Sequence, residues 1–197
     1  QLLVVPGLGH EVECAFQHGL DVVAHLYNTS ARKYGTPQAV YNHKDRRPEI
    51  HCVGILDIER SQLPGINPNP WQTDTCIGVW FYDVRQPFKT ADHVIEMLVD
   101  IVSKNGNLLL NILQKPDGSI DDETRYMLGE LADWFAINGE AIHGTRPLPT
   151  WREGETFFTR RDDTVSAIVC EAPADCGIYL SSVVPPAGAR VACLGIE

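Results

Sequence analysis

The sequence predicts an α/β fold, because residues 90–113 contain a helix that turns directly into an apolar strand. Apolar side chains recur at helical spacing between residues 94 and 102, and Thr90 is placed as the N-cap. Lys104-Asn105-Gly106 supplies a cation and two residues that tolerate left-handed backbone, which is typical of a helix end. In residues 108–113 polar and apolar residues do not alternate. This pattern is typical of a strand in a parallel sheet that is buried on both faces. We interpret the chain as repeats of this unit.

The segments before this unit are predicted to supply further strands and one helix. Residues 2–5, 39–41 and 52–59 are the strand candidates, since each is a mostly apolar run. Residues 20–34 place apolar side chains at helical spacing and end at a glycine, which predicts a helix. The polar run 42–47 is interpreted as a solvated loop.

A different pattern follows the central unit. Ser119 is predicted to cap a helix with an acidic first turn, which ends at Asn138-Gly139. Residues 145–149 contain two prolines and are interpreted as a linker. Short β segments follow, and they predict an antiparallel sheet with too few strands to close a sandwich. These segments are residues 156–159, 165–170, 178–182 and 190–194.

The composition bounds the class of protein and its partners. The chain has 197 residues, of which 44% are hydrophobic and 21% charged, so a packed core is expected. A formal charge of -10 disfavours nucleic acid as a partner, and no apolar run is long enough to span a membrane. The spacing of cysteines and histidines predicts no metal site. No cofactor is expected either. An even number of cysteines permits three disulfides, but free buried thiols are the favoured interpretation of all six: Cys14, Cys52, Cys76, Cys170, Cys176 and Cys193.

Two carboxylates at the end of a predicted strand are the first candidate for a functional site. Asp57 and Glu59 are two residues apart, so they share one face of the strand 52–59. Charges at the carboxyl end of a buried parallel strand are costly unless they are paired or used in chemistry. An equally weighted alternative is that Arg60 and either Arg46 or Arg47 neutralise them at a loop edge.

Aromatic residues close to these carboxylates indicate a sugar-binding cleft. Trp71 follows a proline-rich loop at residues 63–70, and Trp80 begins the cluster Trp-Phe-Tyr. The C–H faces of a pyranose stack on flat rings, and carboxylates accept hydrogen bonds from its hydroxyl groups. The competing interpretation, that these rings pack in a core, is as common for any single residue. Their grouping on predicted loops favours a site.

Seven stretches give the chain a resemblance to a known family. They are VAHLYNTS, DIERSQLPGI, PWQTDTCIG, WFY, LVDIVSKNGNLLLNI, DGSIDDE and NGEAIHGTRP. Residues 20 to about 152 resemble the C-terminal half of the catalytic barrel of glycoside hydrolase family 29, the α-L-fucosidases. The resemblance implies a partial (β/α)8 barrel at residues 1–148 and part of a β-sandwich at residues 149–197. It also implies a retaining mechanism with an aspartate nucleophile and a second carboxylic acid as acid/base.

The same resemblance assigns expected roles to individual residues. Glu59 falls at the acid/base carboxylate of many members, and Trp80 at the aromatic residue that packs on fucose. Trp71 belongs to the same motif block. His43 or Lys44 falls near a cationic residue that contacts the sugar, and Asp57 is added to this expected substrate-binding set. The family's nucleophile follows the strand that matches residues 2–5, where this chain has Pro6-Gly7.

Two hypotheses about function follow. In the first, the chain is a retaining α-L-fucosidase-type glycoside hydrolase that acts on a fucosylated saccharide, with another segment or chain supplying the missing parts. In the second, it is a non-catalytic carbohydrate-binding or assembly remnant of such an enzyme. The apolar edges at residues 2–5 and 108–113 predict a homo-oligomer. The start of the chain lacks the basic region of a signal peptide, which favours a cytoplasmic location.

Overall fold

The computed structural model of the chain describes residues 17–45, 52–171, 174 and 177–195. The strand predicted at residues 2–5, the Pro6-Gly7 pair, Arg46 and Arg47 therefore lie outside the described residues. Among the helices that are described, none combines the length and apolar character needed to cross a membrane.

The cysteines are less buried than the sequence predicts. Cys14 and Cys176 lie outside the described residues. Cys76 is buried and Cys170 is half-buried, whereas Cys52 and Cys193 are exposed, so the prediction of buried thiols is wrong for these last two. No disulfide joins two of the described cysteines.

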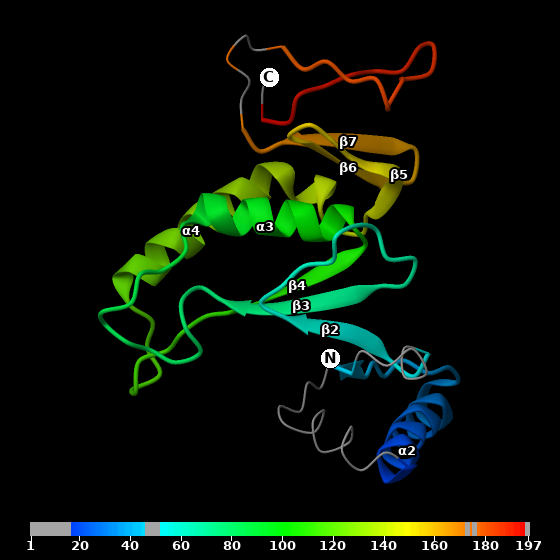
Figure 1. The fold of residues 1–197 in the computed structure, drawn as a ribbon, viewed down its shortest axis with the longest axis vertical. Helices are drawn as coiled ribbons and strands as arrows, with labels where there is room; N and C mark the ends of the chain where they lie inside the picture. The colour runs from blue at the N-terminus through cyan, green and yellow to red at the C-terminus, as the bar shows by residue number, and fades with distance from the viewer. Residues whose placement is uncertain (1–16, 46–51, 172–173, 175–176, 196–197) are drawn as a thin grey trace.

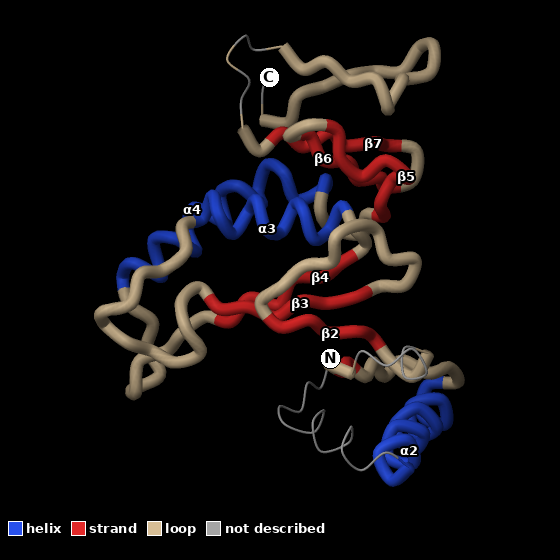
Figure 2. Tube along the Cα trace, in the orientation of Figure 1, coloured by secondary structure: helices blue, strands red, loops and turns tan. Residues whose placement is uncertain are grey.

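Two sheets enclose a layer of helices (Figures 1 and 2). Strands β1 to β4 form a parallel sheet in the order β1-β2-β3-β4, and β5 to β7 form an antiparallel sheet. Helix α3 lies against β4 on one side and against β5 and β6 on the other. The elements are α2 (Gln17–Tyr34), β1 (Asn42–His43), β2 (Ile55–Glu59), β3 (Trp71–Cys76), α3 (Ala91–Ser103), β4 (Gly106–Asn111), α4 (Asp122–Asn138), η2 (Gly139–Ala141), β5 (Arg146–Glu153), β6 (Thr156–Arg161) and β7 (Thr164–Val169).

The N-terminal elements confirm the predicted helix and move the predicted short strand. Helix α2 ends at Tyr34, and Gly35 follows with a φ of 79°, the left-handed conformation that suits a glycine after a helix. Strand β1 comprises residues 42–43 instead of the predicted 39–41, so it begins the run that was interpreted as a loop. The backbone explains the shift, because Tyr41 uses its carbonyl oxygen to accept a hydrogen bond from the Ile55 N–H (2.8 Å) and pairing continues from there.

Strand β3 is the main element that the sequence did not predict. Its residues were interpreted as part of an aromatic loop, yet β3 lies between β2 and β4. Trp71 is 1% exposed and packs with Ile58 and Ile101 in the core between sheet and helix. Thr73 is buried on this same side of the strand and donates from Oγ1 to the carbonyl oxygens of Ile58 and Ser61 (2.7 Å each). Threonine thus takes core positions that an apolar pattern does not reveal.

The central helix–strand unit is confirmed, but its strand is not buried on both faces. Thr90 caps α3 by accepting a hydrogen bond from the His93 N–H, and Asn105 adopts the left-handed backbone that ends the helix (φ 70°). Along β4 exposed and half-buried residues alternate, and Leu109 is 44% exposed while Leu108 and Leu110 pack against the core. Among the described elements, helices cover one face of this strand, and the other face carries the exposed side chains.

Helix α4 begins later than predicted. Its N-cap is Asp121, whose side chain accepts from the Thr124 N–H (2.7 Å). Ser119 instead donates from its hydroxyl group to the Asp117 carboxylate (2.7 Å), within the turn closed by Gly118 (φ 84°). Asp121, one of the acidic residues of the predicted first turn, is therefore the cap itself. The helix ends at Asn138, as predicted.

The antiparallel sheet starts inside the predicted linker. Strand β5 begins at Arg146 and runs across residue 148, because prolines are tolerated on an edge strand. Strands β6 and β7 match two predicted β segments. Val99 of α3, Ile142 and Phe157 of β6 form the core that joins this sheet to the helices.

The last two predicted strands, at residues 178–182 and 190–194, are absent from the described structure. Tyr179 is 85% exposed, so this segment is not covered by another layer. It is held through side chains, since Glu153 of β5 accepts hydrogen bonds from the backbone N–H and hydroxyl groups of Ser181 and Ser182. These hydrogen bonds lower the pKa of Glu153 to about 2.

The buried ammonium group of Lys104 connects the two sheets. Its Nζ donates to Asp100 Oδ2 (2.5 Å) and to the carbonyl oxygen of Leu63 (2.7 Å), and it lies 5.3 Å from the ring centroid of Trp151. Only 4% of its side chain is exposed. The carbonyl oxygen of Lys104 also accepts from the indole of Trp71 (3.0 Å). One residue thus fixes α3, the loop after β2, the start of β3 and strand β5.

We predict that Lys104→Met lowers the free energy of unfolding by about 3–5 kcal/mol, because it leaves the half-buried Asp100 carboxylate without its cation. The measurement is urea unfolding followed by circular dichroism. Lys33→Met, at an exposed position of α2, is the matched control and should change stability by less than about 0.5 kcal/mol. A loss below about 1 kcal/mol for Lys104→Met would contradict the role given to this residue.

Candidate active site

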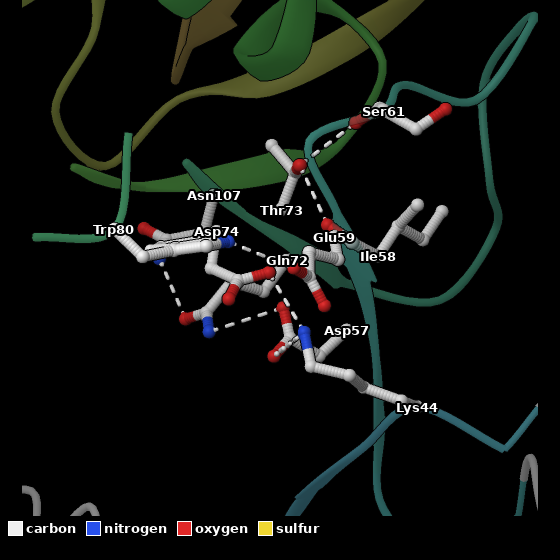
Figure 3. Close-up of polar contacts among 10 residues, drawn as sticks. All are labelled: Lys44, Asp57, Ile58, Glu59, Ser61, Gln72, Thr73, Asp74, Trp80 and Asn107. Carbon is white, nitrogen blue, oxygen red and sulfur yellow. Dashed lines mark hydrogen bonds and ion pairs between the residues drawn. The ribbon is translucent and has the colours of Figure 1, made fainter. Parts of the chain in front are cut away.

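Polar side chains from three neighbouring strands gather on the face of the parallel sheet that the helices do not cover. Asp57 and Glu59 lie on one face of β2, as predicted, while Leu56 and Ile58 point to the core. Asp57 is paired in register with Gln72, and Glu59 with Asp74. Because parallel strands end at one edge of a sheet, three carboxylates meet at the carboxyl ends of β2 and β3 (Figure 3).

Lys44 binds two of these carboxylates. Its Nζ lies 2.7 Å from Asp74 Oδ1 and 3.3 Å from Asp57 Oδ2, so the ammonium bridges β2 and β3. Burial opposes the charge on Lys44, but hydrogen bonds and charges of Asp74 and Asp57 outweigh it and raise the pKa of the ammonium. Burial raises the pKa of the Asp57 carboxyl group, and the nearby Lys44 only partly offsets this. Among the described residues, Lys44 and not Arg60 is therefore the cation that pairs with Asp57.

Two amides extend this cluster across the sheet. Gln72 Nε2 donates to Asp57 Oδ1 (3.4 Å), and Asn107 Nδ2 of β4 donates to Gln72 Oε1 (3.1 Å). Sequence reasoning missed both residues, because neither is charged and β3 was not recognised as a strand. The alternation of Gln72 and Asp74 with the buried Thr73 and Thr75 was the signal that could have revealed them.

Glu59 is held by Trp80, the aromatic residue that is expected to pack on fucose. The indole Nε1 of Trp80 donates to Glu59 Oε1 (3.1 Å). The guanidinium group of Arg60 lies over the Trp80 ring, 4.6 Å from its centroid, and donates to the carbonyl oxygen of Gly78 (3.2 Å). Arg60 adopts a φ of 49°, which is uncommon for a residue other than glycine. Trp80 thus lies between a carboxylate at its edge and a cation on its face.

A cleft of about 510 Å³ opens beside this arrangement. It offers an aromatic ring, a carboxylate and apolar side chains, which is the combination that saccharide binding needs. Its lining residues are Asp74, Thr75, Trp80, Leu109, Leu110, Asn111 and Ile112. In the part of the chain that is described, no group of three or more potential ligand residues is arranged to hold a metal ion.

Two of the expected site residues are buried away from this cleft. The predicted loop position of Trp71 is wrong, because this residue begins strand β3. Its ring packs in the core on the helix side of the sheet. His43 is 1% exposed, lies 3.0 Å through Nδ1 from the carbonyl oxygen of Asp45, and stacks on Tyr41 with centroids 6.0 Å apart. Neither ring lines the cleft.

Comparison with known proteins identifies the family of the chain. A model of the family described as Alpha-L-fucosidase matches residues 16–140, which is more than half of the chain. The chain belongs to the alpha-L-fucosidase family. The matched range contains Glu59, Trp80 and both carboxylate partners of Lys44. The prediction of membership in glycoside hydrolase family 29 is thereby confirmed.

Individual fucosidases agree with this assignment. The chain is 28% identical to human tissue alpha-L-fucosidase over 95% of its own length and 42% of that enzyme. It is 35% identical to an alpha-L-fucosidase of Branchiostoma floridae over 62% of its own length and 29% of that enzyme. It therefore spans less than half the length of these relatives.

Two solved structures share the fold of this chain. An alpha-L-fucosidase from Vibrio sp. strain EJY3 superposes with a TM-score of 0.67 at 24% identity, over 80% of this chain and 28% of that one. A Thermotoga maritima alpha-fucosidase in complex with fucose superposes with a TM-score of 0.64 at 24% identity, over 79% of this chain and 36% of that one.

We predict that Lys44→Met raises the pKa of Asp57 further. With the ammonium gone, Asp57 keeps its burial and its carboxylate neighbour Asp74 but loses the charge that favours its ionised form. Carbon-13 NMR titration of the aspartate carboxyl groups measures the change. Lys33→Met should leave the Asp57 titration where it is, and an unchanged or lower Asp57 pKa in Lys44→Met would contradict the bridging role.

Proposed function

We propose that the chain is part of a retaining α-L-fucosidase-type glycoside hydrolase that releases fucose from fucosylated glycans, with Glu59 as its acid/base. The observation that carries this proposal is the hydrogen bond from the Trp80 indole to the Glu59 carboxylate beside an open cleft. Glu59 and Trp80 are also the residues that the family resemblance marks for acid/base catalysis and for packing on fucose.

The proposed mechanism divides the work between two carboxyl groups. In the first step Glu59 protonates the glycosidic oxygen while a second carboxylate attacks the anomeric carbon. In the second step Glu59 takes a proton from the water molecule that attacks the covalent intermediate and releases the sugar. Trp80 packs on the apolar C–H face of fucose and orients Glu59 through its indole N–H. The nucleophile comes from another segment or chain, because Pro6-Gly7 stands where the family's aspartate is expected.

The proposed fold is part of a (β/α)8 barrel at residues 1–148, followed by part of a β-sandwich at residues 149–197. The β3–α3–β4 unit, in which the described helices lie on one face of the sheet, supports the barrel. The carboxylates at the carboxyl ends of β2 and β3 support it too, since active sites of such barrels lie at that rim.

A second candidate is a non-catalytic carbohydrate-binding or assembly module. The observation that favours it is again Pro6-Gly7, because without a nucleophile the cleft can bind a sugar but not cleave it. Release of nitrophenol from an aryl α-L-fucoside, measured beside calorimetric titration with fucose, separates the two. Binding without release supports the module, and release that saturates with substrate supports the hydrolase.

We also propose that the chain forms a homo-oligomer through the outer edge of β4. Among the described strands β4 pairs only with β3, and its residues include neither lysine nor proline to discourage pairing. Leu109, 44% exposed beside the cleft, adds apolar surface to this edge. A second copy that covers edge and face would bury roughly 2,000 Å² or more, the range of obligate interfaces.

If Glu59 is the general acid, Glu59→Gln should slow substrates with poor leaving groups about 10²–10⁴-fold and activated aryl fucosides much less. The reason is that protonation assists a basic leaving group most. The measurement is kcat/KM across a series of aryl fucosides. Glu96→Gln, at an exposed position of α3, is the control. An equal decrease in kcat/KM across the series would contradict the role of Glu59 as general acid and leave Asp57 or Asp74 as the candidate.

Trp80→Ala should weaken fucose binding while leaving the melting temperature nearly unchanged, because the Trp80 ring is 42% exposed at the cleft. Trp71→Ala is the contrasting variant: the Trp71 ring is 1% exposed, and its loss should cost about 3–5 kcal/mol of stability. Calorimetry and thermal unfolding measure the two effects. A drop in stability for Trp80→Ala as large as that for Trp71→Ala would identify Trp80 as a core residue.

Light scattering at micromolar concentration tests the assembly. The expected result is a mass at least twice the 21.9 kDa of one chain. Leu109→Lys, which places a charge on the exposed face of β4, should shift the protein toward the monomer. A folded, monodisperse monomer of the unmodified chain would refute the proposed oligomer.

A further inference from the structure

The side chain of Gln86 holds the backbone immediately before and after Trp80. Its Oε1 accepts a hydrogen bond from the backbone N–H of Val79 (2.6 Å), and its Nε2 donates to the backbone carbonyl oxygen of Phe81 (3.0 Å). These two backbone groups flank Trp80 in the chain. A single carboxamide therefore pairs with the backbone on both sides of Trp80, as a neighbouring strand would in a sheet.

The residue before this loop leaves room for the carboxamide. A Cβ atom added at Gly78 would lie 2.4 Å from Gln86 Oε1 and 2.9 Å from Gln86 Cδ. Contacts this short force the neighbour to move, and here the neighbour is the end of a flexible side chain. Gly78 is thus required for the position of Gln86 and not for an unusual backbone conformation of its own.

We propose that Gln86 is a positioning residue that holds Trp80 against Glu59 at the cleft. The Trp80 indole has two further contacts, the hydrogen bond to Glu59 and the guanidinium of Arg60 over its ring, and both act on the side chain. Gln86 fixes the backbone from which that side chain projects. The contribution of Gln86 to sugar binding rests on the proposed function, whereas its contribution to the position of the Trp80 indole does not.

The test compares variants by two readouts. Nitrogen-15 NMR reports the Trp80 indole N–H, whose protection from exchange depends on the hydrogen bond to Glu59, and calorimetry reports the fucose dissociation constant. In Gln86→Ala we expect the indole N–H to exchange about tenfold faster and fucose to bind about tenfold more weakly. Gly78→Ala should do the same by displacing the carboxamide, and combining the two should add little. Gln38→Ala, at an exposed position after α2, is the control.

A third variant separates positioning from mere stability. Gln86→Glu keeps the acceptor for the Val79 N–H but turns a carboxylate oxygen toward the Phe81 carbonyl oxygen. Protonation of that carboxyl group restores the donor, so protection of the Trp80 indole should return as pH falls through roughly 4.3, the ordinary pKa of glutamate. Wild-type protein over the same pH range is the reference. A loss of global stability would not be rescued in this way.

The outcomes decide the proposal. Faster indole exchange in Gln86→Ala and Gly78→Ala, with recovery of Gln86→Glu at low pH, supports it. Unchanged indole exchange in Gln86→Ala overturns it, as does a loss of protection without recovery in Gln86→Glu. If wild-type protein fails to bind fucose, the proposed function fails, and the indole readout alone still supports or overturns the role of Gln86.

Discussion

The arrangement of the two sheets and of the candidate active site depends on the contacts of the buried Lys104 ammonium. A cation in a protein interior is costly unless it is fully paired, and Lys104 is paired with Asp100 and with the carbonyl oxygen of Leu63. Its own carbonyl oxygen holds the Trp71 indole, and Trp151 of β5 covers the ammonium. The loop that leaves the carboxyl end of β2 is therefore fixed to the helix layer.

This anchoring lets β2 and β3 use their two faces for different purposes. Ile58 and Trp71 fill the core on the helix side. On the other side, Asp57 and Asp74 share Lys44, while Glu59 meets Trp80. The period of two along a strand produces this separation, so every second residue can be polar at little cost to the core. The cleft lies on the polar side, next to the exposed face of β4.

The sequence predicted the parts of this arrangement that local patterns encode. Helix α3 with its Thr90 cap, the shared face of Asp57 and Glu59, and the family itself are confirmed. The same reasoning missed β3, because one of its buried positions is occupied by Thr73, whose hydroxyl group finds carbonyl partners only after folding.

Contacts distant in sequence explain most of the remaining differences. No periodicity in the sequence could show that Lys44 would meet Asp74, thirty residues away, or that Asn107 would contact Gln72. The exposed face of β4 was missed for the same reason: three consecutive leucines do not reveal that the described helices lie on one side of the strand.

The most direct test of the account is a titration with α-L-fucose followed through the indole N–H signals of the four tryptophans. The account predicts that the Trp80 signal shifts in a saturable manner, since this ring lines the cleft and donates to Glu59. The signal of Trp71, whose indole donates to Lys104 in the core, should stay in place. A titration that leaves Trp80 unchanged, or that shifts Trp71 as much as Trp80, would contradict the assignment of this cleft as a fucose site.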